Sequence, residues 1–272
     1  MVATPIGHLG DLSRRAEEVL KTVQIVAAED TRRTRVLLDH IDHHAPELVS
    51  LHEHNERGMT QKLIARLKQG DDVALVSDAG TPLVNDPGYL IVQAAHAEGI
   101  AAVPIPGACS ITTALSVCPL ACHPFRYVGF VPAKAGARKK ALSEWLNSAD
   151  AVVFLETPHR ILATLADLHA LTQRRIMVAR ELTKQYETIE VGLPDEVALA
   201  LGSNPKGEFT CIVEAAEPRV VSYDRERVLA ALLEELPPAK AARIAASICD
   251  AKKSEMYDLA LALSERAAKS IL

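Results

Sequence analysis

The sequence predicts an α/β protein made of two α/β units followed by a small helical tail. Short apolar runs alternate with helical patterns, and this alternation is typical of a mostly parallel sheet. The run at residues 73–76 is rich in β-branched residues and ends abruptly in small and polar ones. From Pro218 onward the pattern is wholly helical. We therefore expect domains at residues 1–118, 119–218 and 222–272.

Composition and charge narrow the class of protein. With 272 residues, of which 49% are hydrophobic and 24% charged, the chain is long enough to bury two cores. No apolar stretch approaches the roughly twenty residues of a membrane span, and no signal peptide is visible, so we expect a cytoplasmic protein without a membrane partner. The net charge of -5 argues against a surface that binds nucleic acid all over. Residues 218–272 nevertheless hold nine Lys and Arg against eight Asp and Glu.

The five cysteines are an odd and scattered set, which favours reduced thiols over a disulfide framework. Cys118, Cys122 and His123 have the residue types of a zinc site. No second group with matching spacing appears in the sequence, so we predict no bound metal.

In the first unit, residues 2–10 end a very short strand and enter a glycine-containing turn. A helix capped by Asp11 or Ser13 follows. The glycine spacing is not that of a dinucleotide-binding fold. The further elements expected here are strands at 24–28, 48–51, 73–76 and 101–105, and helices reaching His40 and covering 60–69 and 89–98.

The second unit has hairpin character, and the tail has the pattern of three short helices. Expected strands are 127–131, 151–156, 175–180, 186–191 and 209–215, with helices at 160–171, at 194–202 and around Trp145. In the tail, Lys252 and Lys253 directly precede the last helix, as in a DNA- or RNA-reading helix-turn-helix. A helical packing or dimerisation module is the alternative.

The loop at residues 77–88 is too long and too polar for an ordinary connection, which needs two to six residues. Gly80 lets backbone approach a ligand closely, and Pro82 and Pro87 stiffen the path. Ligands of open α/β sheets lie at the carboxyl ends of strands. The sequence therefore predicts a ligand-binding loop here.

Five stretches, in order along the chain, resemble the ribosomal-RNA branch of the tetrapyrrole methylase superfamily. They are A-T-P-I-G-H-L-G-D at 3–11, A-E-D-T-R at 28–32, S-D-A-G-T-P-L-V-N-D-P-G-Y at 77–89, E-T-P-H-R at 156–160 and A-R-E-L-T-K at 179–184. The resemblance implies two α/β domains with S-adenosylmethionine in the trough between them, and a homodimer. It also implies 2'-O-ribose methylation of a cytidine in the decoding region of 16S rRNA, within the small ribosomal subunit.

The resemblance also assigns the positions that hold the cofactor. These are Ile6, Ala79, Gly80, Thr81, Val84, Cys109, Ser110, Glu156 and Leu182. The sequence departs from the branch where His8 replaces Asn and where Ala108 and Cys109 replace a proline-serine pair, and its first strand is short.

A ribose 2'-hydroxyl is a weak acid, so its proton needs an acceptor as the new bond forms. We predict Asp30 as the base or hydroxyl orienter, and Lys184 as the residue that neutralises nearby charge. The alternative for Asp30 is a helix cap with its own ion pair. Cys109 is not expected to be a nucleophile, because direct transfer needs none.

An RNA substrate requires basic side chains for its phosphates and surfaces for its bases. The predicted phosphate contacts are Arg32, Arg33, Lys139, Lys140, Lys252 and Lys253, although residues 138–140 also fit a solvated charge run. Aromatic residues make up only 4% of the chain, and Tyr89, Phe130 and Tyr257 are the candidates for stacking.

Two other functions remain open at this point. One is methyl transfer to a tetrapyrrole or to a protein side chain within the same superfamily. The other is a non-catalytic RNA-binding factor in ribosome assembly, which would not bind S-adenosylmethionine.

Overall fold

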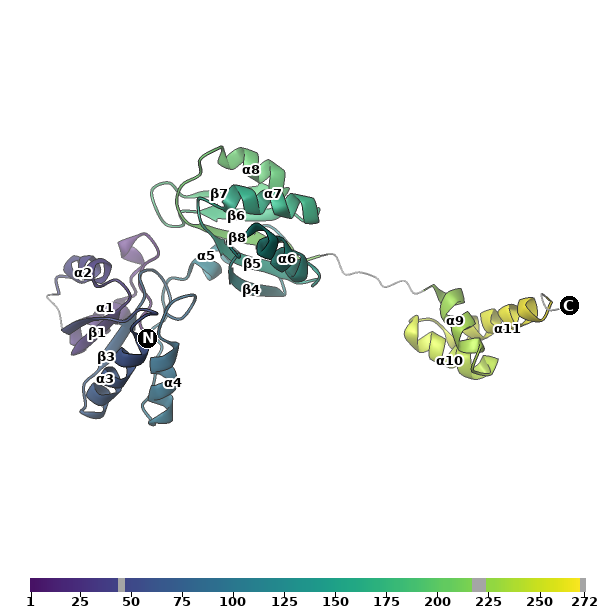
Figure 1. Cartoon of the computed structure of the whole chain (residues 1–272), viewed down its shortest axis with the longest axis horizontal. Coiled ribbons are helices and arrows are strands. Elements are labelled where there is room, and N and C mark those ends of the chain that lie inside the picture. Colours follow the sequence, from purple (N-terminus) through teal and green to yellow (C-terminus); the bar gives the residue numbers. More distant parts are fainter. Residues whose placement is uncertain (44–46, 217–223, 270–272) are drawn as a thin grey trace. The chain divides into compact units, whose positions relative to one another are not determined.

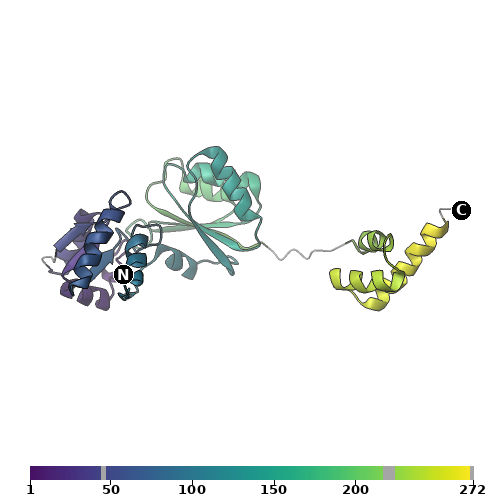
Figure 2. The same cartoon turned by 60° about the horizontal axis from the view of Figure 1, so that its bottom comes forward.

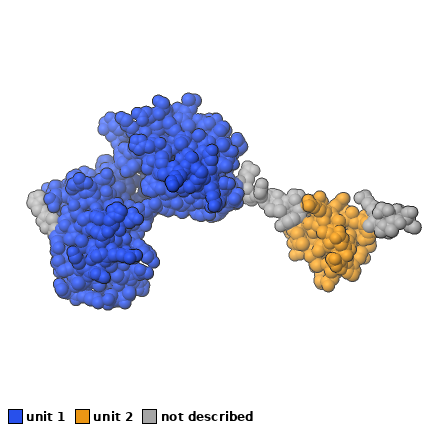
Figure 3. All heavy atoms as spheres, viewed as in Figure 1, with its two compact units in different colours: residues 1–217 blue, residues 218–272 orange. Residues whose placement is uncertain are grey.

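The computed structural model describes residues 1–43, 47–216 and 224–269. The chain divides into two compact units, residues 1–217 and 218–272, which Figure 3 shows in two colours. The first unit contains two separate sheets and the second is helical (Figure 1).

The first sheet is parallel, with β1 (Ile25–Ala28) between β2 (Glu47–Ser50) and β3 (Val73–Val76). All four residues of β1 are buried, because the strand has a neighbour on each side and helices on both faces. Val26 and Ala28 face the core under helices α1 (Arg14–Thr22) and α2 (Thr31–His40). Ile25 and Ala27 face the core under helices α3 (Glu56–Lys68) and α4 (Tyr89–Ala97). A short 3-10 helix, η1 (Leu9–Asp11), precedes α1.

Ser13 caps α1, since its Oγ accepts a hydrogen bond from the amide of Ala16 at 3.1 Å. Of the two caps that the sequence allowed, the structure uses this one.

The predicted strand at residues 101–105 is wrong. Only Ile105 forms an isolated parallel bridge, with Val2. The amide of Ile105 donates to the carbonyl of Met1 at 2.8 Å, and the amide of Val2 donates to the carbonyl of Leu75 at 2.9 Å. The first residues of the chain thus lie between β3 and Ile105, and this pairing is too brief for a ladder.

The second sheet has the order β4-β5-β8-β6-β7. Strands β4 (Phe125–Phe130) and β5 (Ala151–Glu156) are parallel, and the pairings among β5, β8 (Phe209–Val213), β6 (Ile176–Arg180) and β7 (Thr188–Gly192) are antiparallel. Figure 2 shows these strands crossing at the angles of a twisted sheet.

Helices cover both faces of the second sheet. One face packs against α6 (Ala135–Leu146), α7 (Ile161–Leu171) and α8 (Pro194–Leu201), and the other against α5 (Ser110–Ser116). The core under α5 also contains Ile6 from the N-terminal segment, packed with Met177 and Ala179. A residue that precedes the first sheet therefore belongs to the core of the second.

The expectation of a solvated charge run at residues 138–140 is wrong for Arg138. Its side chain is only 8% exposed, and its Nε donates to Asp167 Oδ2 at 2.7 Å. Burial of a guanidinium without a partner would be costly. Arg138 on α6 has such a partner in Asp167 on α7.

The second unit packs three helices around alanines. They are α9 (Arg225–Leu233), α10 (Pro238–Ile248) and α11 (Lys253–Lys269). Leu229, Ala245 and Met256 are fully buried at their junction. Lys252 and Lys253 lie exposed at the start of α11, as expected. Within the described residues, no helix has the length and apolar character to cross a membrane.

Candidate active site

The 77–88 loop leaves the carboxyl end of β3 and closes against the N-terminal segment. Thr4 and Gly80 exchange two backbone hydrogen bonds, of 2.9 and 3.1 Å. Gly80 has φ +85°, and a Cβ there would lie 3.2 Å from Ile6 Cγ2. Glycine is therefore required both by the conformation and by the close approach of the two segments.

The same loop is also fixed to the second sheet. The Tyr127 hydroxyl donates to Asn85 Oδ1 at 2.5 Å. Asn85 has φ 71°, a left-handed conformation that asparagine tolerates. A Cβ on Gly129 would lie 2.9 Å from Asn85 Nδ2, at a β-bulge in strand β4. Burial, with smaller contributions from Cys109 and Asp86, raises the pKa of Tyr127 to about 12, so the hydroxyl remains a donor.

A second contact joins the Gly7–His8 peptide to the turn at residues 181–184. The amide of His8 donates to Thr183 Oγ1 at 3.0 Å. A Cβ on Gly7 would lie 2.5 Å from Lys184 Cγ and 3.0 Å from the carbonyl oxygen of Leu182. The N-terminal segment is therefore packed directly on the turn that follows β6 of the second sheet.

Two cavities of different size lie around this contact. The larger, about 210 Å³, is lined by Leu9, Arg33, Val36 and Asp78 among others. The smaller, about 30 Å³, is lined by Ser110, Ala179, Leu182 and Thr210. The two cavities share Ile6, Lys184 and Glu208, so one short wall separates them.

The charged part of this wall is an ion-pair cluster. Lys184 Nζ lies 3.0 Å from Glu181 Oε1 and 3.1 Å from Glu208 Oε2. Burial acts to lower the pKa of Lys184, but the hydrogen bonds to the two carboxylates outweigh it and the pKa is raised. Lys184 is therefore a permanent cation at neutral pH.

The side chain of Asp30 caps the start of helix α2. Its Oδ1 accepts from the amide of Arg32 at 2.9 Å, and its Oδ2 pairs with Arg32 Nη2 at 2.7 Å. The hydrogen bonds from Arg32 lower the pKa of Asp30 to about 2. This is the capping arrangement that the sequence offered as the alternative, and Asp30 does not line either cavity. A carboxylate with this pKa is a weak base at neutral pH.

A second carboxylate in this region, that of Asp86, has a raised pKa, in contrast to Asp30. Burial raises the pKa of Asp86 to about 6, the charges of Glu29 and Asp78 add to this effect, and a hydrogen bond from Ser77 opposes it. Asp78 itself accepts from the amide of Asp30 at 2.8 Å and lies 3.5 Å from Arg33 Nη1. Within the described part of the chain, no three His, Cys, Asp or Glu side chains gather as metal ligands.

The predicted cofactor residues divide into three groups. Ile6, Ala79, Ser110 and Leu182 line the cavities. Gly80, Thr81, Val84 and Cys109 support the walls, as when the Thr81 hydroxyl donates to the carbonyl of Ala108 at 3.1 Å.

Glu156 is the exception among the predicted cofactor residues. It is buried, pairs with Arg160 at 2.8 Å and accepts from the Thr164 hydroxyl at 2.8 Å. Its carboxylate fixes the start of α7, and it lines neither cavity.

The predicted phosphate contacts are spread over the chain. Arg33 lines the larger cavity, whereas Arg32 pairs with Asp30. Lys139 and Lys140 are exposed on α6, 3.6 Å from Asp167 and 3.9 Å from Glu144. Sequence reasoning missed Glu208, Leu9 and Val36, since nothing in their local pattern marks them.

Comparison with known proteins now identifies the family. Residues 1–198 match the sequence profile of the Tetrapyrrole (Corrin/Porphyrin) Methylases. The chain belongs to the tetrapyrrole methylase family. The helical unit of this tetrapyrrole methylase matches a further profile, the RsmI C-terminal HTH domain, over residues 222–264. The family resemblance and the fold class predicted from the sequence are thereby confirmed.

Curated relatives of this tetrapyrrole methylase match it over nearly their whole length. "Ribosomal RNA small subunit methyltransferase I" of Escherichia coli O157:H7 is 45% identical over 269 residues, which are 96% of this chain and 93% of the relative. The protein of the same name from Xylella fastidiosa strain Temecula1 is 44% identical, over 94% of this chain and 96% of the relative. The chain is therefore a methyltransferase.

Solved structures of lower identity share the fold of this tetrapyrrole methylase. Diphthine synthase aligns with TM-score 0.59 and 16% identity, over 78% of this chain and 87% of its own. Uroporphyrin-III C-methyltransferase from Thermus thermophilus aligns with TM-score 0.53 and 20% identity, over 78% of this chain and 91% of its own.

Proposed function

We propose that this tetrapyrrole methylase transfers a methyl group from S-adenosylmethionine to the 2'-hydroxyl of a cytidine in the decoding region of 16S rRNA. The observation that carries the proposal is the wall of Ile6, Lys184 and Glu208, shared by two cavities of different chemistry. The names of the full-length relatives support ribosomal RNA of the small subunit as the substrate class.

The residues around the smaller cavity suit the donor, but the cavity of about 30 Å³ is far below the roughly 300 Å³ of a cofactor site, so they would form only part of its contact surface. Ile6, Ala179 and Leu182 provide apolar contact, and Ser110 and Thr210 provide hydroxyls for the polar edges of a nucleoside. The carboxylates of Asp78 and Glu208, which line the adjoining larger cavity, would offset the positive charge of a sulfonium. S-adenosylmethionine held against these residues would supply an electrophilic methyl group.

The larger cavity has the residues that the acceptor requires. The permanent cation Lys184 stabilises the negative charge that grows on an attacking oxygen. Glu208 is the carboxylate on the shared wall, and we assign it the proton of the hydroxyl in place of Asp30. The packing of the N-terminal segment on the 181–184 turn would hold these groups in position.

The wider assembly follows from the same proposal. RNA phosphates contact Arg33 at the cavity and exposed basic residues elsewhere, namely Arg32, Lys139, Lys140, Lys252 and Lys253. The substrate is the small ribosomal subunit, and the enzyme acts in the cytoplasm as a homodimer. Light scattering of the purified protein tests the dimer.

The test is mass mapping of 16S rRNA after incubation of unmethylated small subunits with enzyme and S-adenosylmethionine. We expect one methylated cytidine ribose, and calorimetry should show binding of the cofactor. Methylation of uroporphyrinogen but not of RNA would replace this proposal with a tetrapyrrole substrate. Absence of cofactor binding would make the protein a non-catalytic factor.

A further inference from the structure

The mouth of the larger cavity carries two exposed apolar side chains. Val36 on α2 is 62% exposed and Leu9 on η1 is 38% exposed, and both line the cavity. Single exposed apolar residues are common on protein surfaces. These two differ because they line the same cavity as the charged side chains of Asp78, Lys184 and Glu208. We call Leu9 and Val36 the mouth patch.

The mouth patch is not needed by the core. Helix α2 already buries Thr34, Leu37 and Leu38 against the first sheet. Val36 lies outside that stripe and gains nothing from packing in the described chain. An exposed valine in the middle of a helix also has modest helix propensity, so local structure does not favour it either.

Arg33 gives the patch a charged flank. It precedes Val36 by three residues, so both side chains lie on one side of α2. Its guanidinium is 64% exposed and lies 3.5 Å from Asp78, a loose pair that competes weakly with an incoming anion. Arg32 differs, because two hydrogen bonds hold it to Asp30.

We propose that the mouth patch is the surface on which the base of the acceptor nucleotide packs, with Arg33 on the adjacent phosphate. This inference rests on the proposed function and names the contacts of its substrate. A nucleotide drawn out of a single strand loses its stacking partners, and an apolar surface replaces them. Aromatic residues are only 4% of this chain, so aliphatic side chains fill that role.

Charge complementarity selects this occupant. The patch is apolar and suits the face of a base, Arg33 is positively charged and suits a phosphate, and Lys184 and Glu208 line the same cavity. A second copy of the chain is the alternative occupant, and the experiment below separates the two.

The experiment compares Val36→Asp with Leu199→Asp, a matched change on helix α8, where Leu199 is 84% exposed and lines none of the cavities described. Initial rates are measured against small-subunit concentration, together with cofactor affinity by calorimetry and mass by light scattering. We expect Val36→Asp to raise KM for the subunit about tenfold and to leave cofactor affinity unchanged. Val36→Leu should retain the wild-type KM, and Leu199→Asp should match wild type.

Two outcomes would overturn the inference while the proposed function stands. One is a Val36→Asp enzyme with the KM of Leu199→Asp. The other is a wild-type dimer that Val36→Asp converts to a monomer, which would assign the patch to a second copy. If wild-type enzyme binds cofactor but methylates no RNA, the proposed function itself fails and the inference fails with it.

Discussion

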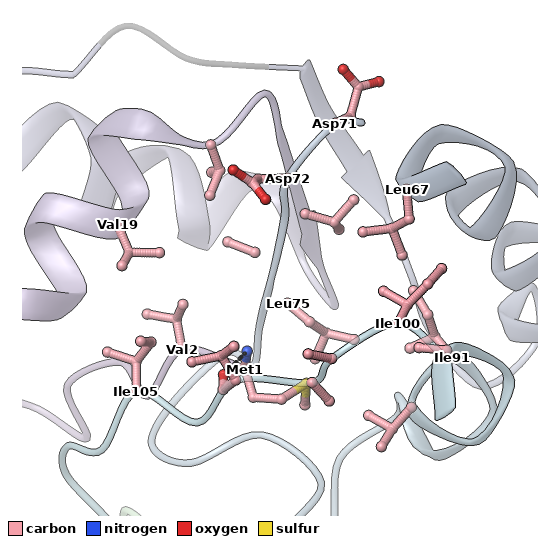
Figure 4. Close-up of a pocket in the computed structure, with 18 of the residues that line it drawn as sticks. Met1, Val2, Val19, Leu67, Asp71, Asp72, Leu75, Ile91, Ile100 and Ile105 are labelled. Carbon is pink, nitrogen blue, oxygen red and sulfur yellow. Dashed lines mark hydrogen bonds between the residues drawn. The ribbon is translucent and has the colours of Figure 1, made fainter. Parts of the chain in front are cut away.

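The first sheet has a cavity at each end, and the larger of these two is lined mostly by apolar residues. The cavity at the amino end of β3 measures about 430 Å³, against about 210 Å³ at the carboxyl end. Figure 4 shows the apolar side chains around it, including Val2, Leu75, Ile91 and Ile105. Its carboxylates are Asp71 and Asp72, and Asp71 pairs with Arg66. Volume alone therefore does not locate the site.

The difference lies in what the two ends bring together. The carboxyl end gathers Arg33, Asp78, Lys184 and Glu208 from four separate segments, contributed by both sheets. The cavity at the amino end is lined only by residues between Met1 and Ile105. Reactive groups with fixed geometry require converging elements, and a parallel sheet provides these where its strands end.

Loss of the cation on the shared wall should have the largest effect. Lys184→Met keeps the length of the side chain but removes the charge that we propose stabilises the attacking oxygen, so we expect kcat to fall about 100-fold. Steady-state kinetics with small subunits measures this. Lys62→Met, on the exposed surface of α3, is the control and should keep wild-type kcat. An unchanged kcat in Lys184→Met would remove that residue from the mechanism.

Disturbing the contact between the two loops should have the next largest effect. Gly7→Ala places a methyl group against Lys184 Cγ and the Leu182 carbonyl, so the loops must separate. Affinity for S-adenosylmethionine, measured by calorimetry, should fall at least about tenfold. Gly136→Ala, where a Cβ meets nothing within 4 Å, should bind normally. Equal affinities in the two variants would show that the loop contact does not shape the donor site.

Asp86 should make the carboxyl end pH-sensitive. Its pKa is about 6 in the folded protein against 3.8 ordinarily, so the folded state holds an extra proton between these values and stability falls as the pH rises through them. Asp86→Asn removes the ionisable group and with it this loss of stability at higher pH. In urea denaturation we expect the variant to be more stable than wild type by about 1 kcal/mol at pH 7.5, allowing for partial exposure, and equal to it at pH 4. The same difference at both pH values would contradict this assignment.

The smallest effect on activity should come from filling the amino-end cavity. Ala95→Leu adds apolar volume to that space, and we expect a gain of up to about 1 kcal/mol in the free energy of unfolding. Methyl transfer should stay within about twofold of wild type. Ala16→Leu, at a fully buried position that lines no described cavity, should instead destabilise the protein. A loss of activity in Ala95→Leu would give the amino end a functional role.

Local patterns predicted most of the fold, because strand and helix signals are carried by neighbouring residues. The run at β3, the cap at Ser13 and the three tail helices are of this kind. The strand expected at 101–105 failed because Pro104, which has no amide hydrogen to donate, lies inside the run, and only Ile105 pairs, with Val2.

The site was harder to predict, because its partners are distant in sequence. The sequence predicts a solvated Arg138, but its side chain is buried and pairs with Asp167, which is 29 residues away in sequence. Glu208 forms an ion pair with Lys184, which is 24 residues away in sequence. Glu156 has a carboxylate as expected, but this carboxylate forms an ion pair with Arg160. Motifs located the loops, and only tertiary structure shows which side chains of the loops face the cavities.

The position of Ile6 has a consequence for folding. Because this side chain lies in the core beneath the second sheet, we expect that the two sheets do not unfold independently at this junction. Amide hydrogens at Thr4 and Gly80, which are bonded to each other beside it, should exchange with solvent only through global opening of the first unit. The backbone beside the shared wall should thus be protected from exchange as strongly as the core itself.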